Sequence, residues 1–127
     1  MSKVPSSVIE LAIEEAEKST IKKAQMSAVI WDKKGILSSG YNQWLANISD
    51  DRYNYFGVPY HSQHAEVSAI LRLRDDWRWR LENASIFIYR RGWKLASPCK
   101  HCKHVLQQMG ISRVYWSEEN GYIGGYL

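Results

Sequence analysis

The sequence has no apolar run long enough to span a bilayer, and its first residues lack the basic-then-apolar order of a signal peptide. It also contains no internal repeat, low-complexity tract or linker. Apolar residues make up 45% of the chain, which is enough for one modest core. These features predict a soluble, cytoplasmic protein with no membrane partner, built as a single domain over residues 1–127.

Cysteine is scarce as well. The chain has two cysteines, and they lie three residues apart in Cys99-Lys100-His101-Cys102. A secreted scaffold held by disulfides would carry more cysteines, spread along the sequence. A close pair in a chain without an export signal predicts metal or redox chemistry instead, including a thioredoxin-like dithiol as one alternative.

Positive charge and aromatic residues are present in some excess. The net charge is +4, and there are six tryptophans and eight tyrosines. A mildly basic chain suits an anionic ligand, from a nucleotide phosphate to a polynucleotide. The aromatic rings can stack on bases, or they can fill the core or an oligomer interface. Composition alone leaves both alternatives open.

The periodicity of apolar residues predicts alternating helices and strands. A helix is expected over residues 6–19, with Ser6 or Ser7 as its N-cap, followed by a hairpin and a long loop. Strands that alternate with helices after residue 84 predict a partly parallel sheet covered by helices. The remaining expected elements are strands at 25–31 and 35–41, a loop at 42–62, a helix at 64–74, a strand at 84–89, a helix at 98–109 with Pro98 in its first turn, and a strand at 111–116.

Two short segments carry the chemistry: His64-Ala65-Glu66 and Pro98-Cys99-Lys100-His101-Cys102. Zinc binds imidazole and thiolates readily, and three protein ligands leave a fourth tetrahedral position for water. Cys99 and Cys102 lie one helical turn apart, so they face the same way at a helix start, where thiol pKa values are lowered. Glu66 is predicted to carry protons and not to bind the metal, because a fourth protein ligand would displace the water.

The complete pattern His-x-Glu … Pro-Cys-x-x-Cys resembles the cytidine/deoxycytidylate deaminase superfamily, over roughly residues 25–117. The resemblance implies a three-layer α/β/α sandwich with a central mixed sheet, one Zn²⁺ per chain, and a homo-oligomer. Histidine at position 64 resembles the deoxycytidylate and tRNA-adenosine deaminase branch. A fifth strand has to come from the short tail at 121–127.

Further site residues follow from the same resemblance. Gly40-Tyr41-Asn42 is similar to the Gly-x-Asn that closes the family's second strand, which implies that Asn42 binds a sugar hydroxyl. The backbone at Ala65, Ser97 and Pro98 is likewise implied to contact the base. The loop before His64 is expected to cover the site with aromatic residues, namely Tyr53, Tyr55, Phe56 and Tyr60.

The expected reaction is hydrolytic deamination of a cytosine nucleotide or nucleoside, with dCMP favoured, which releases ammonia and gives the uracil product. One alternative is deamination of cytosine or adenine within single-stranded RNA or DNA. Another alternative is a non-catalytic zinc-binding protein, for example with a closed structural site formed by His61, His64, Cys99 and Cys102.

Overall fold

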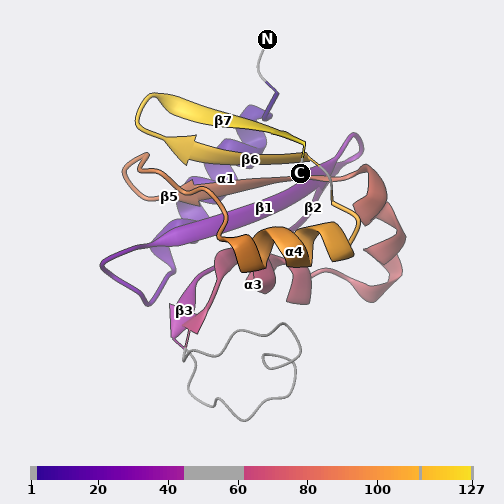
Figure 1. Cartoon of the computed structure of the whole chain (residues 1–127), viewed down its shortest axis with the longest axis horizontal. Helices are drawn as coiled ribbons and strands as arrows, with labels where there is room; N and C mark the ends of the chain where they lie inside the picture. The colour runs from indigo at the N-terminus through magenta and orange to yellow at the C-terminus, as the bar shows by residue number, and fades with distance from the viewer. Residues whose placement is uncertain (1–2, 45–61, 112, 127) are drawn as a thin grey trace.

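A five-stranded mixed sheet forms the middle layer of the structure, a computed structural model that describes residues 3–44, 62–111 and 113–126, without the side chains of Ser62 and Tyr126 (Figure 1). The strand order is β2-β1-β5-β6-β7. A separate two-stranded ladder joins β3 to β4. The strands are β1 (Met26–Asp32), β2 (Gly35–Tyr41), β3 (Gln43–Trp44), β4 (Ser62–Gln63), β5 (Ser85–Arg90), β6 (Arg113–Glu118) and β7 (Gly121–Tyr126).

Strand pairing confirms the predicted hairpin and the partly parallel sheet. β1 pairs antiparallel with β2 on one side and with β5 on the other, so Ala28 lies opposite both Gly40 and Ile88. β5 and β6 run parallel, with Ser85 opposite Arg113. The tail does supply a fifth strand, because β7 folds back antiparallel on β6.

Helices cover both faces of the sheet, as a three-layer α/β/α sandwich requires (Figure 1). Helix α1 (Ser6–Glu17) packs on one face, and helices α3 (Ala65–Leu71) and α4 (Lys100–Gln108) pack on the other. A 3₁₀ helix, η1 (Asp75–Asn83), connects α3 to β5. No helix in the described part of the chain is both long and apolar enough to cross a bilayer.

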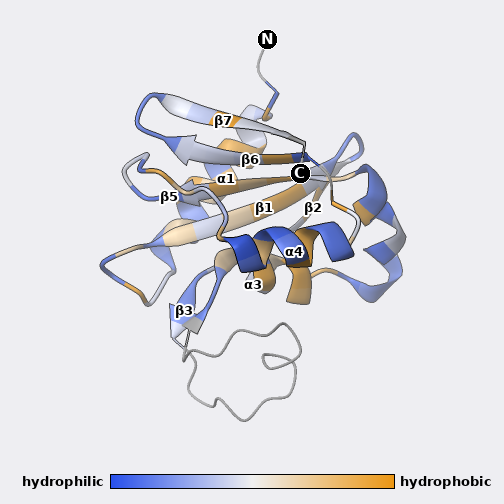
Figure 2. Ribbon diagram, in the orientation of Figure 1, coloured by the Kyte–Doolittle hydropathy of each residue, from blue (hydrophilic) through white to orange (hydrophobic). Residues whose placement is uncertain are grey.

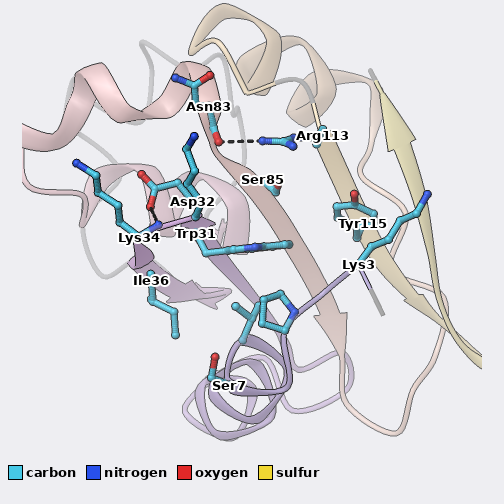
Figure 3. A pocket seen from close by; sticks show the side chains of 14 residues that line it. Lys3, Ser7, Trp31, Asp32, Lys34, Ile36, Asn83, Ser85, Arg113 and Tyr115 are labelled. Atoms are coloured by element: carbon cyan, nitrogen blue, oxygen red, sulfur yellow. Dashed lines mark hydrogen bonds between the residues drawn. The ribbon is translucent and has the colours of Figure 1, made fainter. Parts of the chain in front are cut away.

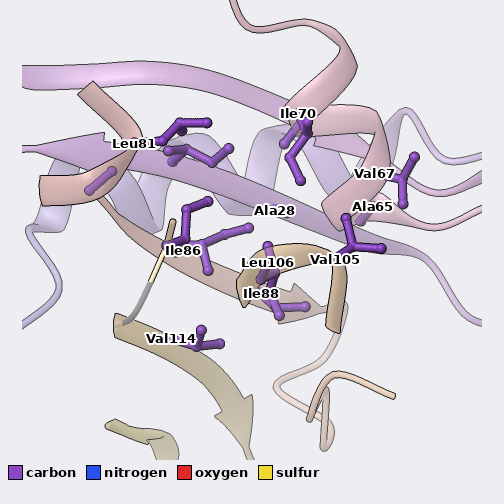
Figure 4. Close-up of a cluster of buried hydrophobic side chains, with 14 of the residues drawn as sticks. Ala28, Ala65, Val67, Ile70, Leu81, Ile86, Ile88, Val105, Leu106 and Val114 are labelled. Atoms are coloured by element: carbon purple, nitrogen blue, oxygen red, sulfur yellow. The ribbon is translucent and has the colours of Figure 1, made fainter. Parts of the chain in front are cut away.

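The face under α3 and α4 is mainly aliphatic. Ile86 and Ile88 of β5 point to this side and meet Ile70 of α3 and Leu106 of α4 (Figure 4). In Figure 2 the central strands and the inner sides of these helices are coloured as hydrophobic, while the outer surface of α4 is hydrophilic. This packing fixes the two helices, and therefore their first residues, against the same sheet.

A glycine sets how closely α3 approaches β2. A Cβ on Gly40 would collide with the backbone nitrogen of Ala69 and lie 2.6 Å from Oγ of Ser68. The Ser38 hydroxyl donates a 2.6 Å hydrogen bond to the carbonyl of Ala69, which ties the same turn of α3 to β2. The helix is therefore positioned by backbone-to-backbone contact, which only glycine permits.

The face under α1 is aromatic. Rings on β1, β5, β6 and β7, and that of Trp93 in the turn after β5, meet at tilted or edge-to-face angles. Examples are Phe87 and Tyr122 at 5.8 Å and Tyr89 and Trp93 at 5.2 Å between centroids. These rings account for part of the aromatic excess as core packing. Trp44 and Trp79 are exceptions, since they are 55% and 68% exposed.

The helix expected over 6–19 does begin at Ser6, but its predicted N-cap is wrong, and the helices expected from 64 and 98 begin one and two residues later. Pro5 is the N-cap of α1 and has extended backbone angles, its carbonyl accepts from the amides of Val8 and Ile9, and no side chain caps the helix. Helix α4 begins at Lys100 with Cys99 as its N-cap, so Pro98 precedes the helix. The predicted roof residues Tyr53, Tyr55, Phe56 and Tyr60, and the alternative ligand His61, lie outside the described residues.

Candidate active site

Three potential zinc ligands meet where α3 and α4 begin. His64 is the N-cap of α3, Cys99 is the N-cap of α4, and Cys102 lies in the first turn of α4. One ligand atom from each lies within 4.8 Å of the others. The sequence placed these residues on two separate helix starts, and the fold brings the two starts together.

The distances between these atoms fit tetrahedral zinc. Nδ1 of His64 lies 3.1 Å from Sγ of Cys102 and 3.9 Å from Sγ of Cys99. Zinc bonds of about 2.3 Å to sulfur and 2.0–2.1 Å to nitrogen, at a tetrahedral angle, place sulfur and nitrogen roughly 3.6 Å apart. The observed values lie on either side of that spacing, and one imidazole with two thiolates is a donor set that zinc prefers, so the three residues fit the ion.

The surroundings of Cys102 would favour a bound cation next to its sulfur. Its side chain is fully buried. Burial, with the nearby charges of Glu66 and Cys99, raises the pKa of the Cys102 thiol above its ordinary value. A divalent ion beside the sulfur would reverse this shift and hold the residue as a thiolate. Two thiolates would also balance the charge of the ion.

The ring nitrogen and the two sulfurs differ in access to solvent. Cys102 is buried and His64 is half-buried, whereas Cys99 is exposed. The amide of Cys102 donates to Sγ of Cys99 at 3.4 Å, so this sulfur both caps the helix and faces the open side. The positive end of the α4 dipole supports negative charge there.

Glu66 lies beside the ligands but is not one of the three residues grouped as a metal site. It sits in the first turn of α3, two residues after His64, and only 4% of it is exposed. Glu66, His64 and Cys99 line the same cavity of about 220 Å³. A buried carboxylate at such a cavity can exchange protons with a small molecule held inside it.

The cavity also contains several residues singled out from the sequence. Asn42, Ala65 and Ser97 line it. Pro98 is buried next to Ser97 but is not among the lining residues. Ile21 and Met26 complete the wall. They could not be predicted from the sequence, because an apolar residue at either position is equally typical of a core.

Asn42 is held by a network that the sequence did not reveal. Its Oδ1 accepts hydrogen bonds from the Ser19 hydroxyl at 2.6 Å and from the amide of Met26 at 2.8 Å. Its Nδ2 donates to the carbonyl of Ala24 at 2.7 Å. Within the described residues, one N–H of the amide is left for a ligand. Asn42 therefore faces the cavity as a fixed donor.

One histidine and two cysteines beside a buried carboxylate are typical of zinc hydrolases. In this class three protein ligands leave one coordination position of the metal open, next to a buried acid. The comparison with protein families narrows the class. The sequence model of the family described as "Cytidine and deoxycytidylate deaminase zinc-binding region" matches residues 2–118, and the chain belongs to this family. It is therefore a zinc-dependent deaminase of cytosine compounds.

Solved structures share the fold at low sequence identity. Cytidine deaminase from Burkholderia pseudomallei is 17% identical with a TM-score of 0.67, and the match covers 99% of this chain and 93% of that one. The dCMP deaminase of cyanophage S-TIM5 is 18% identical with a TM-score of 0.59, over 87% of this chain and 79% of that one. Cytidine deaminase from Mycobacterium leprae is 15% identical with a TM-score of 0.58, over 94% and 91%. The comparison with curated protein sequences gave no match.

Proposed function

We propose that this chain is a single catalytic domain over residues 1–127 that deaminates a cytosine nucleotide or nucleoside, with dCMP as the favoured substrate. In this proposal His64, Cys99 and Cys102 hold one zinc ion, and Glu66 moves the protons. The observation that carries it is the burial of Glu66 in the cavity that His64 and Cys99 also line.

The bound ion would supply Lewis acidity, which lowers the pKa of a water molecule toward neutrality. Glu66 would accept both protons of this water, one after the other, and would deliver the first to the ring nitrogen and the second to the departing amine. Its burial keeps the carboxylate away from bulk water, so the proton stays within the cavity. Ile21 and Met26 exclude further water from the base.

The proposal gives the remaining cavity residues orienting roles. The free N–H of Asn42 donates to a sugar hydroxyl, because its other polar atoms are already bonded within the protein. The backbone at Ala65, Ser97 and Pro98 contacts the base. Support for dCMP over cytidine comes from histidine at position 64 and from the net charge of +4, which suits a phosphate. The active form is proposed to be a homo-oligomer.

An ammonia-release screen tests the substrate. Purified zinc-loaded protein is assayed against cytosine, cytidine, deoxycytidine, CMP, dCMP and single-stranded DNA and RNA oligonucleotides. The highest kcat/KM is expected for dCMP. If only oligonucleotides react, the polynucleotide alternative replaces the proposal. Such a substrate would also show binding that falls steeply with salt, since many phosphate contacts release counterions.

The variant Glu66→Gln tests the proton carrier. It keeps the size of the side chain, so we expect unchanged zinc content and melting temperature, with turnover reduced roughly 10²–10⁴-fold or more. Glu14→Gln on the exposed surface of α1 is the matched control and should be fully active. Full activity in Glu66→Gln would refute the assigned role and favour the non-catalytic alternative.

A further inference from the structure

A second cavity lies at the end of the strands opposite the zinc site. It has a volume of about 730 Å³ and is bordered by the start of α1, the turn between β1 and β2, and the first residues of β5 and β6 (Figure 3). Met26 of the catalytic cavity and Trp31 of this one are five residues apart on β1, which is roughly 16 Å along a strand. This cavity is therefore separate from the catalytic site and independent of the proposed function.

A small residue on β5 helps to create the cavity. Along β5, Phe87 and Tyr89 fill the face under α1, but the next residue on that face toward the strand start is Ser85. Helix α1 begins at Ser6 and does not cover this corner of the sheet. Trp31 and Tyr115, whose ring centroids lie 5.9 Å apart, form the apolar part of its wall (Figure 3).

The rim of the cavity is strongly cationic. Its lining includes four cationic residues, and within the described parts of the chain none of them forms an ion pair: Lys3, Lys33, Lys34 and Arg113. Arg113 instead donates a 2.9 Å hydrogen bond to the carbonyl of Asn83, which holds its guanidinium at the rim (Figure 3). Like charges gathered without partners repel one another, and an anionic ligand would relieve that repulsion.

The single acidic residue of the lining does not neutralise these cations, because it is already bonded elsewhere. Both carboxylate oxygens of Asp32 accept hydrogen bonds from Arg80 at 2.8 Å, and Oδ1 also accepts from the amide of Lys34 at 2.9 Å. The side chains of this ion pair are only 8% and 12% exposed. The cavity therefore keeps a net positive charge.

Two polar groups of the wall belong to largely buried residues, but their polar atoms are not among the buried unpaired atoms of the described structure. The Ser85 hydroxyl belongs to a residue that is 5% exposed, and the Trp31 indole N–H to one that is 8% exposed. Neither makes a hydrogen bond to any of the described residues. Both polar groups are therefore accessible to water or to a ligand in the cavity. Donors placed below a ring of cations are suited to the oxygens of an anion.

We propose that this cavity is a binding site for a phosphorylated small molecule, whose phosphate oxygens contact Lys34, Arg113 and the Ser85 hydroxyl. The volume falls within the range of about 300–1,000 Å³ that is typical of small-molecule sites. A concave corner between the start of α1 and the hairpin turn suits a compact ligand, whereas a polynucleotide would need a longer basic track across the surface.

Titration calorimetry with sodium pyrophosphate and sodium tripolyphosphate at physiological ionic strength tests the site. Saturable binding with one site per chain is expected. Lys34→Gln combined with Arg113→Gln should weaken binding at least about 10-fold, because two charge-assisted contacts are lost. The matched control is Lys22→Gln with Arg78→Gln, which removes the same charge from other exposed positions and should change the affinity less than about 2-fold.

Ser85→Val tests whether binding depends on the shape of the cavity, because it leaves the charge unchanged. The variant keeps the net charge and introduces a residue type favoured in strands, while it narrows the hollow beside residue 85 and removes the hydroxyl. We expect loss of pyrophosphate binding with the melting temperature retained; Ser85→Ala should fold equally well and bind several-fold more weakly than the native chain. The proposal is overturned if native protein shows no saturable binding, if both double variants weaken it equally, or if Ser85→Val binds normally. Tighter binding of a single-stranded oligonucleotide, lost in the Lys34 and Arg113 variant, would also overturn it in favour of a polynucleotide surface.

Discussion

Asn42 should be important for folding as well as for its proposed contact with substrate, and Asn42→Ala tests the contribution to folding. The change removes three buried hydrogen bonds, those from Ser19 and Met26 to Oδ1 and that from Nδ2 to Ala24. A buried hydrogen bond contributes about 1 kcal/mol net, and a partner left unsatisfied costs about 1–3 kcal/mol. We therefore expect Asn42→Ala to lower the free energy of unfolding by at least about 3 kcal/mol.

Ser19→Ala measures the part of this loss in unfolding free energy that comes from the bond between Ser19 and Asn42. It removes the hydroxyl that donates to Asn42 and accepts from the amide of Ile21, while the other two bonds of the Asn42 amide remain. The expected loss is about 1–2 kcal/mol. In the double variant the losses should not add, because the bond between the two side chains can be removed only once, and the coupling should be about 1 kcal/mol.

Urea unfolding followed by circular dichroism measures these differences, in both zinc-loaded and zinc-free protein. Asn120→Ala, at an exposed position in the turn between β6 and β7, is the control and should leave stability unchanged. A loss below about 1 kcal/mol for Asn42→Ala, or strict additivity with Ser19→Ala, would show that the network does not hold the amide. Asn42 would then be a ligand-binding residue alone.

Three further perturbations have definite expected outcomes. Gly40→Ala should cost at least about 2 kcal/mol and reduce kcat, because its Cβ meets backbone of α3, whereas Gly125→Ala, with open space around it, should be neutral in the same thermal melts. Arg80→Gln should lower the urea midpoint at pH 7. Arg80 holds the pKa of Asp32 below its ordinary value, so the pair stabilises the fold above about pH 4, and the difference between native and variant should shrink as the pH falls below that value. Cys102→Ser should bind less than one zinc per chain in metal analysis and lose the rise in melting temperature that zinc gives the native protein; a full complement of zinc would contradict its role as a ligand.

Local sequence patterns predicted most of the fold. The predicted hairpin over 25–31 and 35–41 agrees with β1 and β2 to within one residue. Alternation of side chains and a turn that ends at Gly35 leave few other registers. The φ angle of Gly35 is 138°, in the region that favours glycine. The family motif predicted the candidate zinc ligands and Glu66. Their separation along the chain does not indicate contact without the resemblance.

The features that sequence analysis missed depend on tertiary contacts. The predicted start of α4 is two residues too early because the usual capping rules do not include a cysteine. In the structure, Sγ of Cys99 accepts a hydrogen bond from the amide of Cys102. The bonds of Asn42 to Ser19 and Ala24 join a loop after α1 to the end of β2, and no local signal marks such a pairing. The hollow at Ser85 exists only because α1 stops short of it.

The two faces of the sheet impose different demands on its residues. On the aliphatic face, Gly40 lets α3 rest directly on β2, while Leu106 of α4 packs into the same cluster as Ile70 of α3. The helix starts are thereby fixed by the core, and Nδ1 of His64 already lies 3.1 Å from Sγ of Cys102. The ligand geometry is thus a consequence of packing that extends well beyond the metal. Stability changes in this aliphatic core should therefore alter zinc affinity, whereas filling the Ser85 hollow on the opposite face should not.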